Sequence, residues 1–115
     1  MSNFLTDLDA ITAHGGGDSP EYGMGGILRT TNTITTTGTG INHNILFTDA
    51  VAKDYTLGSN VEAVLVTKET VLHAFMPSWQ IYPPGAYPCT PLDTTCIQKY
   101  AYMHAVDSTG LGVAV

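Results

Sequence analysis

The chain has 115 residues, of which 43% are hydrophobic and 12% are charged, and this length predicts one small domain, residues 1–115, with a single core. Its formal net charge is -6, and its four basic residues are scattered singly, which argues against nucleic acid as a partner because phosphate binding needs a basic patch. No apolar run reaches the roughly 18 residues of a membrane span, and the N-terminus lacks the basic start and long apolar stretch of a signal peptide.

The N-terminal part predicts two helices separated by glycines. Apolar residues recur with helical spacing at Phe4, Leu5, Leu8 and Ile11. This spacing indicates a short amphipathic helix over residues 3–13, which ends at the run HGGGDSPE, residues 14–21. Asp18 or Ser19 can cap a second helix over about residues 20–30. Because glycine is costly inside a helix, we expect the glycines of this second helix to pack closely on something flat, such as a sheet.

Two segments in the middle of the chain predict buried strands. Residues 30–40 are rich in threonine and predict a surface connection. The stretch NILFTDA follows, and its consecutive apolar residues, 45–47, are typical of a strand buried on both faces. The stretch VLHAFM, residues 71–76, predicts a second such strand. We expect the strands 44–48 and 71–76 to lie parallel in the centre of a sheet.

The remaining elements complete an alternation of helices and strands. Ser59 and Glu62 have the spacing of a capping box, which predicts a helix to about residue 68. Residues 77–93 carry five of the six prolines and predict a long irregular loop. Thr95 can cap a last helix that buries Ile97 and His104, and GLGVAV begins a final strand. The alternation predicts an α/β fold with a mainly parallel sheet.

The cysteines and the glycine run leave alternatives open. Cys89 and Cys96 form either a small-loop disulfide or two ordinary thiols. The run from His14 suits an oxyanion hole or a phosphate cradle, but the chain lacks the G-x-S-x-G of a nucleophile elbow, and Asp18 stands where a phosphate loop needs a lysine. A small hydrolase that uses this loop therefore remains only as an alternative.

A metal site is the better-motivated chemistry. Ligands of parallel α/β sheets gather beyond the carboxyl ends of the strands, and Asp49 directly follows a predicted strand, while Asp18 sits at a loop-to-helix junction. These two carboxylates could share Mg²⁺ or Ca²⁺; the simpler alternative is that each caps a helix or a turn. The four histidines show no ligand spacing, which favours structural roles for them.

Two motifs in order resemble a known family. The stretches GGGDSPEYGMGGILR and NILFTDAVAKDYTL are similar to the von Willebrand factor A domain of the hemicentin type. The resemblance covers most of residues 4–76 and, more loosely, the last helix and strand. It implies a Rossmann-like three-layer α/β sandwich, here without the first strand and its Asp-x-Ser-x-Ser loop, and with Ser19 in place of the family's cysteine.

The resemblance also implies a function. Such domains act in adhesion or matrix assembly through protein contacts, often at a metal-ion-dependent adhesion site, to which Asp49 matches the third-loop ligand and Asp18 falls in the second loop. We therefore expect a non-enzymatic protein-binding or structural module, with an unidentified protein partner and weak Mg²⁺ or Ca²⁺ binding at an incomplete site. The setting is extracellular if the chain is part of a longer secreted protein. A fragment with no independent activity is the further alternative.

Overall fold

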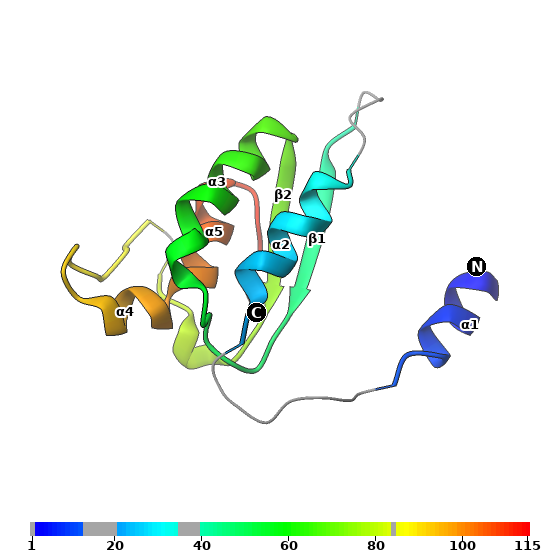
Figure 1. Ribbon diagram of the computed structural model, residues 1–115, viewed down its shortest axis with the longest axis horizontal. Helices are drawn as coiled ribbons and strands as arrows, with labels where there is room; N and C mark the ends of the chain where they lie inside the picture. The colour runs from blue at the N-terminus through cyan, green and yellow to red at the C-terminus, as the bar shows by residue number, and fades with distance from the viewer. Residues whose placement is uncertain (1, 13–20, 35–39, 84) are drawn as a thin grey trace.

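The computed structural model describes residues 2–12, 21–34, 40–83 and 85–115. The elements, in chain order, are α1 (Ser2–Asp9), α2 (Gly23–Asn32), β1 (Asn42–Phe47), the short 3-10 helix η1 (Tyr55–Leu57), α3 (Gly58–Thr67), β2 (Thr70–Phe75), the 3-10 helix η2 (Ser78–Gln80), α4 (Thr94–Lys99) and α5 (Ala101–Ser108). Figure 1 shows α2 and α3 lying over the two strands, with α1 set apart from them. Helices alternate with parallel strands, which confirms the predicted α/β class.

The two strands are parallel, as predicted. They run in register from the pair Asn42 and Thr70 to the pair Phe47 and Phe75. On its other side β2 meets the C-terminal segment, where the Ala74 N–H donates to the Val113 carbonyl at 2.9 Å. Within the described residues no segment pairs with the other edge of β1. The prediction that both strands lie in the centre of the sheet is therefore correct for β2, whereas β1 is an edge strand among the described residues.

The core lies on one face of the sheet. Side chains alternate between the two faces of a strand, and those of Leu72 and Ala74 in β2 point into a buried cluster with helices α2, α3 and α5. The helical members of this cluster include Met24, Ile27, Val61, Leu65, Tyr102 and Val106. The helical spacing within each element thus turns one apolar stripe of each helix toward the same sheet face.

The opposite face of the sheet is largely bare. Ile45 is 53% exposed, Phe47 73% and Phe75 45%. The rings of Phe47 and Phe75 stack on each other with centroids 4.8 Å apart. The prediction that β1 is buried on both faces is wrong, because no described helix covers this face; among the described residues the expected third layer is not formed.

Distant or unexpected groups cap the helices. The N-terminus of α2 receives the carboxylate of Asp54 from outside the helix, whereas the predicted caps, Asp18 and Ser19, lie outside the described residues. The prediction that Ser59 and Glu62 form a capping box is wrong. Helix α3 begins at Gly58, and its N-cap residue, Leu57, makes no side-chain hydrogen bond. The last predicted helix is divided into α4 and α5.

The glycines of α2 do not lie flat on the sheet as expected. Gly23 faces Tyr102 of α5, and Gly25 faces the Asp54 carboxylate. A β-carbon at Gly23 would overlap the hydroxyl of Tyr102. Close packing of α2 is therefore confirmed, but its neighbour is another helix and an acidic cap.

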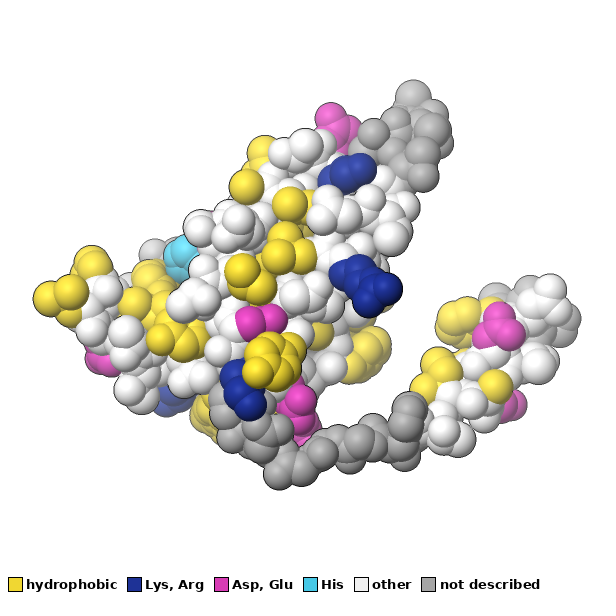
Figure 2. Space-filling model, in the orientation of Figure 1, with side chains coloured by type: hydrophobic (Ala, Val, Ile, Leu, Met, Phe, Trp, Pro, Cys, Tyr) yellow, Lys and Arg dark blue, Asp and Glu magenta, His cyan; other side chains and the backbone are white. Residues whose placement is uncertain are grey.

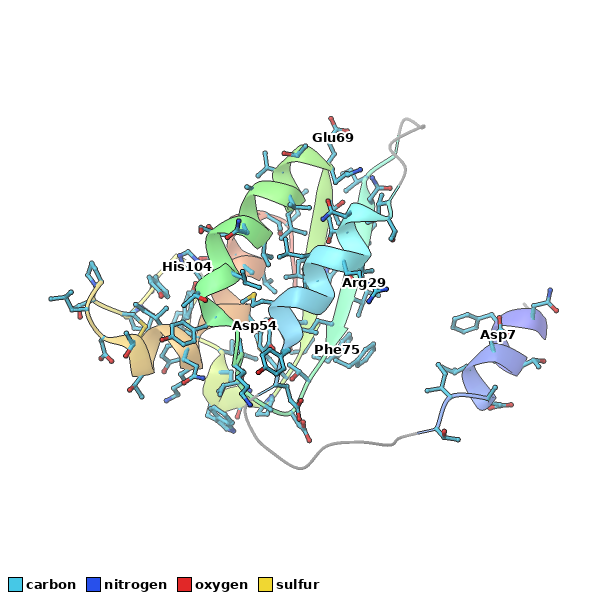
Figure 3. The ribbon with its side chains drawn as sticks, in the orientation of Figure 1. Asp7, Arg29, Asp54, Glu69, Phe75 and His104 are labelled. Atoms are coloured by element: carbon cyan, nitrogen blue, oxygen red, sulfur yellow. A yellow bond between two sulfur atoms is a disulfide. The ribbon has the colours of Figure 1, made fainter. Side chains whose placement is uncertain are left out.

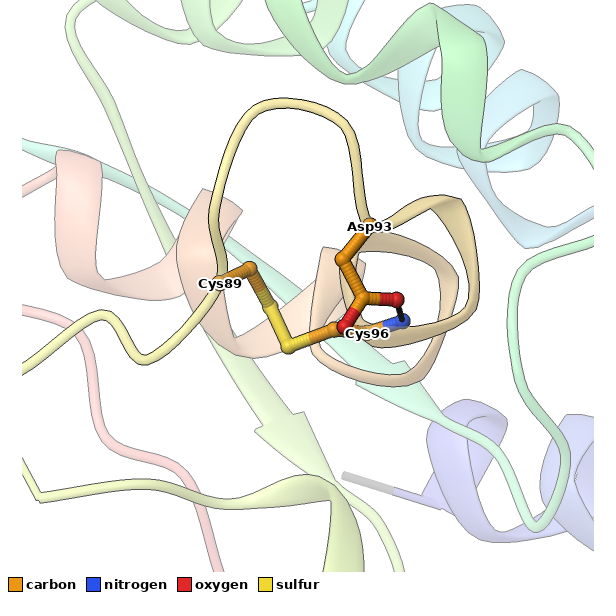
Figure 4. Close-up of a disulfide and its surroundings, with 3 residues drawn as sticks. All are labelled: Cys89, Asp93 and Cys96. Carbon is orange, nitrogen blue, oxygen red and sulfur yellow. Dashed lines mark hydrogen bonds between the residues drawn. A yellow bond between two sulfur atoms is a disulfide. The ribbon is translucent and has the colours of Figure 1, made fainter.

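A disulfide closes the proline-rich segment. Cys89 and Cys96 are bonded, with Cα atoms 5.5 Å apart. Between them Asp93, and not the predicted Thr95, caps α4 by accepting the Cys96 N–H at 3.0 Å, as Figure 4 shows. The disulfide is thus the alternative that the structure supports.

Helix α1 confirms the predicted N-terminal helix, although it ends at Asp9 and not at residue 13. Phe4, Leu5, Leu8 and Ile11 are all exposed. None of the helices in the described part of the chain combines the length and apolar character needed to cross a bilayer.

Candidate functional site

The first part of the site is the turn that follows β1. The Thr48 N–H donates to the Phe75 carbonyl at 3.0 Å, which extends the pairing with β2 by one residue. The Thr48 hydroxyl then donates to the Ala50 carbonyl at 3.1 Å and accepts the Ala50 N–H at 3.2 Å. This closed pair of hydrogen bonds fixes the turn, so that Asp49 is exposed at the carboxyl end of the strand.

The second part is the segment that leads into α2. Glu21 forms an isolated parallel bridge with Ala52. Its N–H donates to the Val51 carbonyl at 2.9 Å, and its carbonyl accepts the Lys53 N–H at 2.6 Å. These bonds hold the start of α2 beside the turn after β1.

Together the two parts line a solvent-open cavity of about 470 Å³. Its walls are Glu21, Tyr22, Gly23, Leu46, Phe47, Thr48 and Asp49. Two carboxylates and a threonine hydroxyl therefore share one hollow, next to a tyrosine ring that carries the Lys53 ammonium 5.1 Å from its centroid. The hollow offers oxygen atoms, the ligands that Mg²⁺ and Ca²⁺ prefer.

Of the two predicted ligands, the structure places one. Asp49 lies at the predicted edge, whereas Asp18 and His14 lie outside the described residues, so the approach of Asp18 to Asp49 stays a prediction. The sequence analysis did not include Glu21, the last residue of the run HGGGDSPE, among the candidate ligands. The spacing carried a signal, since Glu21 follows the glycine loop by a few residues.

The described residues contain no group of three or more His, Cys, Asp or Glu side chains arranged to hold a metal ion. Glu21 and Asp49 by themselves supply few of the six to eight oxygen ligands that Ca²⁺ takes. Water would have to fill the remaining positions around a cation in this cavity.

Three of the histidines have structural partners, as predicted. His43 and His73 share a hydrogen bond of 2.9 Å across the bare sheet face, and His73 Nδ1 accepts the Val113 N–H at 3.2 Å. His104 binds Glu62. The expected burial of His104 is wrong, because 42% of its side chain is exposed.

The position of the polar residues relative to the sheet and the family comparison point to the same kind of domain. In α/β proteins with a parallel sheet, ligands gather beyond the carboxyl ends of the strands, and polar residues lie at that edge in this chain. The family model of the von Willebrand factor A domain matches residues 1–80, and the chain belongs to this family. The match spans α1 through β2 and η2, and leaves α4 and α5 outside it.

The other comparisons gave no relatives. Neither the search of curated proteins nor the search of solved structures found a match. Domains of the von Willebrand factor A family are generally interaction modules and not enzymes.

Proposed function

We propose that the chain is a non-enzymatic protein-binding or structural module of the hemicentin-like type, from an extracellular matrix or adhesion protein. The glycine loop GGGDSPE and the strand end FTDA support the subtype. The Cys89–Cys96 disulfide supports an extracellular setting, since disulfides persist in oxidising compartments. The partner is a protein that docks at the carboxyl edge of β1.

One observation carries this proposal. Asp49 is exposed at the end of β1 and shares its hollow with Glu21 and Thr48. A carboxylate presented in this way can bind a partner's cationic group directly, or can bind it through a divalent cation that both sides ligate. Asp18 and Asp49 are the proposed ligands of Mg²⁺ or Ca²⁺, and with so few ligands we expect dissociation constants in the millimolar range.

Calorimetric titration of the chain with MgCl₂ and CaCl₂ tests the metal. We expect weak binding that Asp49→Ala and Asp18→Ala abolish. Asp7→Ala is the matched control, because it removes the same charge from an exposed position on α1. Tight binding that survives Asp49→Ala would place the metal elsewhere.

Turnover assays test the non-enzymatic part of the proposal against the hydrolase alternative. Generic ester and phosphate substrates are incubated with the chain and with His14→Ala and Asp18→Ala variants. We expect no hydrolysis above that of the buffer. Hydrolysis that either variant abolishes would replace the proposal with an enzyme that uses the glycine loop.

A further inference from the structure

A second cavity lies away from β1, between α3, α5 and the loop before α4. It has a volume of about 210 Å³. Tyr55 lines it from η1, Ser59 and Glu62 line it from the first turns of α3, and His104 lines it from α5. Tyr87 and Ile97 line it from the two sides of the disulfide. Figure 3 labels His104 on the side of the molecule where α3 and α5 meet, and Figure 2 shows an exposed histidine among apolar side chains in the same place.

An acid and an imidazole meet in this cavity. His104 Nδ1 and Glu62 Oε1 are 2.5 Å apart. A carboxylate only accepts hydrogen bonds, so Nδ1 is the donor, and Nε2 of the neutral ring is left as an acceptor. The second carboxylate oxygen of Glu62 is also an acceptor. In this neutral tautomer the pair offers a ligand two acceptors and one negative charge.

The aromatic residues that line the cavity also favour a cationic ligand. The ring of Tyr87 lies against His104, with centroids 4.2 Å apart, and Tyr55 lines the cavity from η1. Tyrosine faces attract cations that lie within about 6 Å of the ring centroid. Burial and the charge of Glu62 raise the pKa of Tyr87, so the negative field of Glu62 reaches the aromatic wall.

The volume of the cavity and the charges of its lining residues restrict the kind of ligand that fits. The volume is below the roughly 300–1,000 Å³ of cavities for drug-sized molecules, and it suits the end of a single side chain. Glu62 is the carboxylate among the lining residues, and none of them is Lys or Arg. The chain as a whole carries a formal charge of -6, which also favours the approach of a cation.

We propose that this cavity binds a primary alkylammonium group, supplied by a lysine side chain of a partner protein, between the Glu62 carboxylate, His104 Nε2 and the ring of Tyr87. The lysine as source rests on the proposed protein-binding function, whereas the ammonium site does not. The site is separate from the hollow at Asp49. The Cys89–Cys96 disulfide lies between Tyr87 and Ile97 in the chain and holds both walls in place.

Nuclear magnetic resonance titration with n-butylammonium chloride tests the site. At about pH 8 we expect saturable shifts of the His104 and Tyr87 ring signals in the millimolar range. Sodium butyrate, with the opposite charge on a similar carbon chain, should give no saturable shift. No saturation by butylammonium, or equal binding of butyrate, would overturn the proposal.

Matched variants assign the binding to the named groups. Glu62→Gln should weaken butylammonium binding about fivefold or more, while Glu69→Gln, the same change at an exposed position just after α3, should leave it unchanged. Tyr87→Leu should also weaken binding, and it serves as the test if Glu62→Gln fails to fold. Unchanged affinity in a folded Glu62→Gln or Tyr87→Leu variant would refute the site.

A further pair of measurements separates this proposal from the function proposed above. A blocked pentapeptide with a central lysine should bind more tightly than butylammonium, and the same peptide with norleucine should not bind. Peptide binding weaker than that of the free amine would overturn lysine as the source. Asp49→Ala should leave amine binding unchanged, so loss of metal binding at Asp49 and loss of amine binding at Glu62 are distinguishable.

Discussion

The carboxylate of Asp54 accepts a hydrogen bond of 2.7 Å from the backbone N–H of Gly25, which lies 29 residues earlier in the chain. Its other oxygen accepts the Met24 N–H at 3.0 Å. The first N–H groups of a helix have no partner within the helix, and here one side chain satisfies two of them. Figure 3 shows Asp54 at this end of α2. The contact joins the loop after β1 to the helix that begins beside Asp49.

Removal of this cap should destabilise the fold. Asp54→Ala leaves two partly buried N–H groups unpaired, and we expect the free energy of unfolding to fall by about 2 kcal/mol. Asp54→Asn keeps one acceptor and should cost less. Urea unfolding followed by circular dichroism measures both, with Asp7→Ala on α1 as the charge-matched control. Equal stability of Asp54→Ala and Asp7→Ala would show that the cap contributes nothing.

Two glycines of α2 should respond in opposite ways to alanine. A β-carbon at Gly23 would overlap the hydroxyl of Tyr102, whereas one at Gly26 would meet nothing within 4 Å. We expect Gly23→Ala to destabilise by about 1–3 kcal/mol through overpacking, and Gly26→Ala to stabilise by up to about 1 kcal/mol through helix propensity.

Thermal or urea unfolding of the two variants checks this prediction. Adding Tyr102→Phe to Gly23→Ala removes the atom nearest to the new methyl group, and should restore part of the lost stability. If Gly23→Ala is as stable as Gly26→Ala, the close approach of α2 to α5 is not present in solution.

The sequence predicted elements well where the signal was local. The apolar run 71–76 predicted β2, and the glycines and the alternation of elements predicted a parallel α/β fold with a closely packed α2. In each case neighbouring residues carry the information, because strand and helix periods repeat over a few positions.

The sequence failed where partners are distant. Asp54 caps α2 from 29 residues away, and no spacing rule within α2 points to it. Glu62 had the spacing of a capping box, but it binds His104, 42 residues later. The apolar residues 45 and 47 predicted burial on both faces of β1, yet burial depends on what covers a face, and no described element covers this one. Glu21 was missed for a similar reason: it is brought to the site by its bridge to Ala52, a residue distant in the sequence.

Loss of the disulfide should destabilise the loop before α4. Cys89 and Cys96 are 7 residues apart, and closing so short a loop contributes about 2 kcal/mol in the chain-entropy account. We expect a Cys89→Ser, Cys96→Ser double variant to lose about that much free energy of unfolding. Asp93→Ala, which removes the cap of α4 within the same loop, is the comparison and should cost less.

Mass spectrometry with and without reductant checks the bond itself. A mass increase of about two hydrogens on unfolding in reductant is expected. Two free thiols in an oxidising preparation would contradict the structure. If the double variant is as stable as the wild type, the disulfide does not contribute to the free energy of unfolding.

Tyr102 should make the fold sensitive to alkali. Its side chain is 1% exposed, and burial, with the charge of Asp54 as a second cause, raises its pKa to about 12. In the unfolded chain a tyrosine ionises near pH 10. Between about pH 10 and pH 12 the unfolded state therefore loses a proton that the folded state keeps, so stability is full below this window and falls as pH rises through it. The expected loss is roughly 1–3 kcal/mol.

Urea unfolding at a series of alkaline pH values measures this loss. Tyr102→Phe removes the ionising group and should flatten the fall in stability between about pH 10 and pH 12. Tyr22→Phe, at an exposed position, is the matched control and should leave the slope unchanged. Burial and the charge of Asp107 also raise the pKa of Tyr82, so a Tyr82→Phe, Tyr102→Phe double variant should flatten the curve further. If Tyr102→Phe loses stability as steeply as the wild type, the Tyr102 hydroxyl is not buried between α5 and the start of α2.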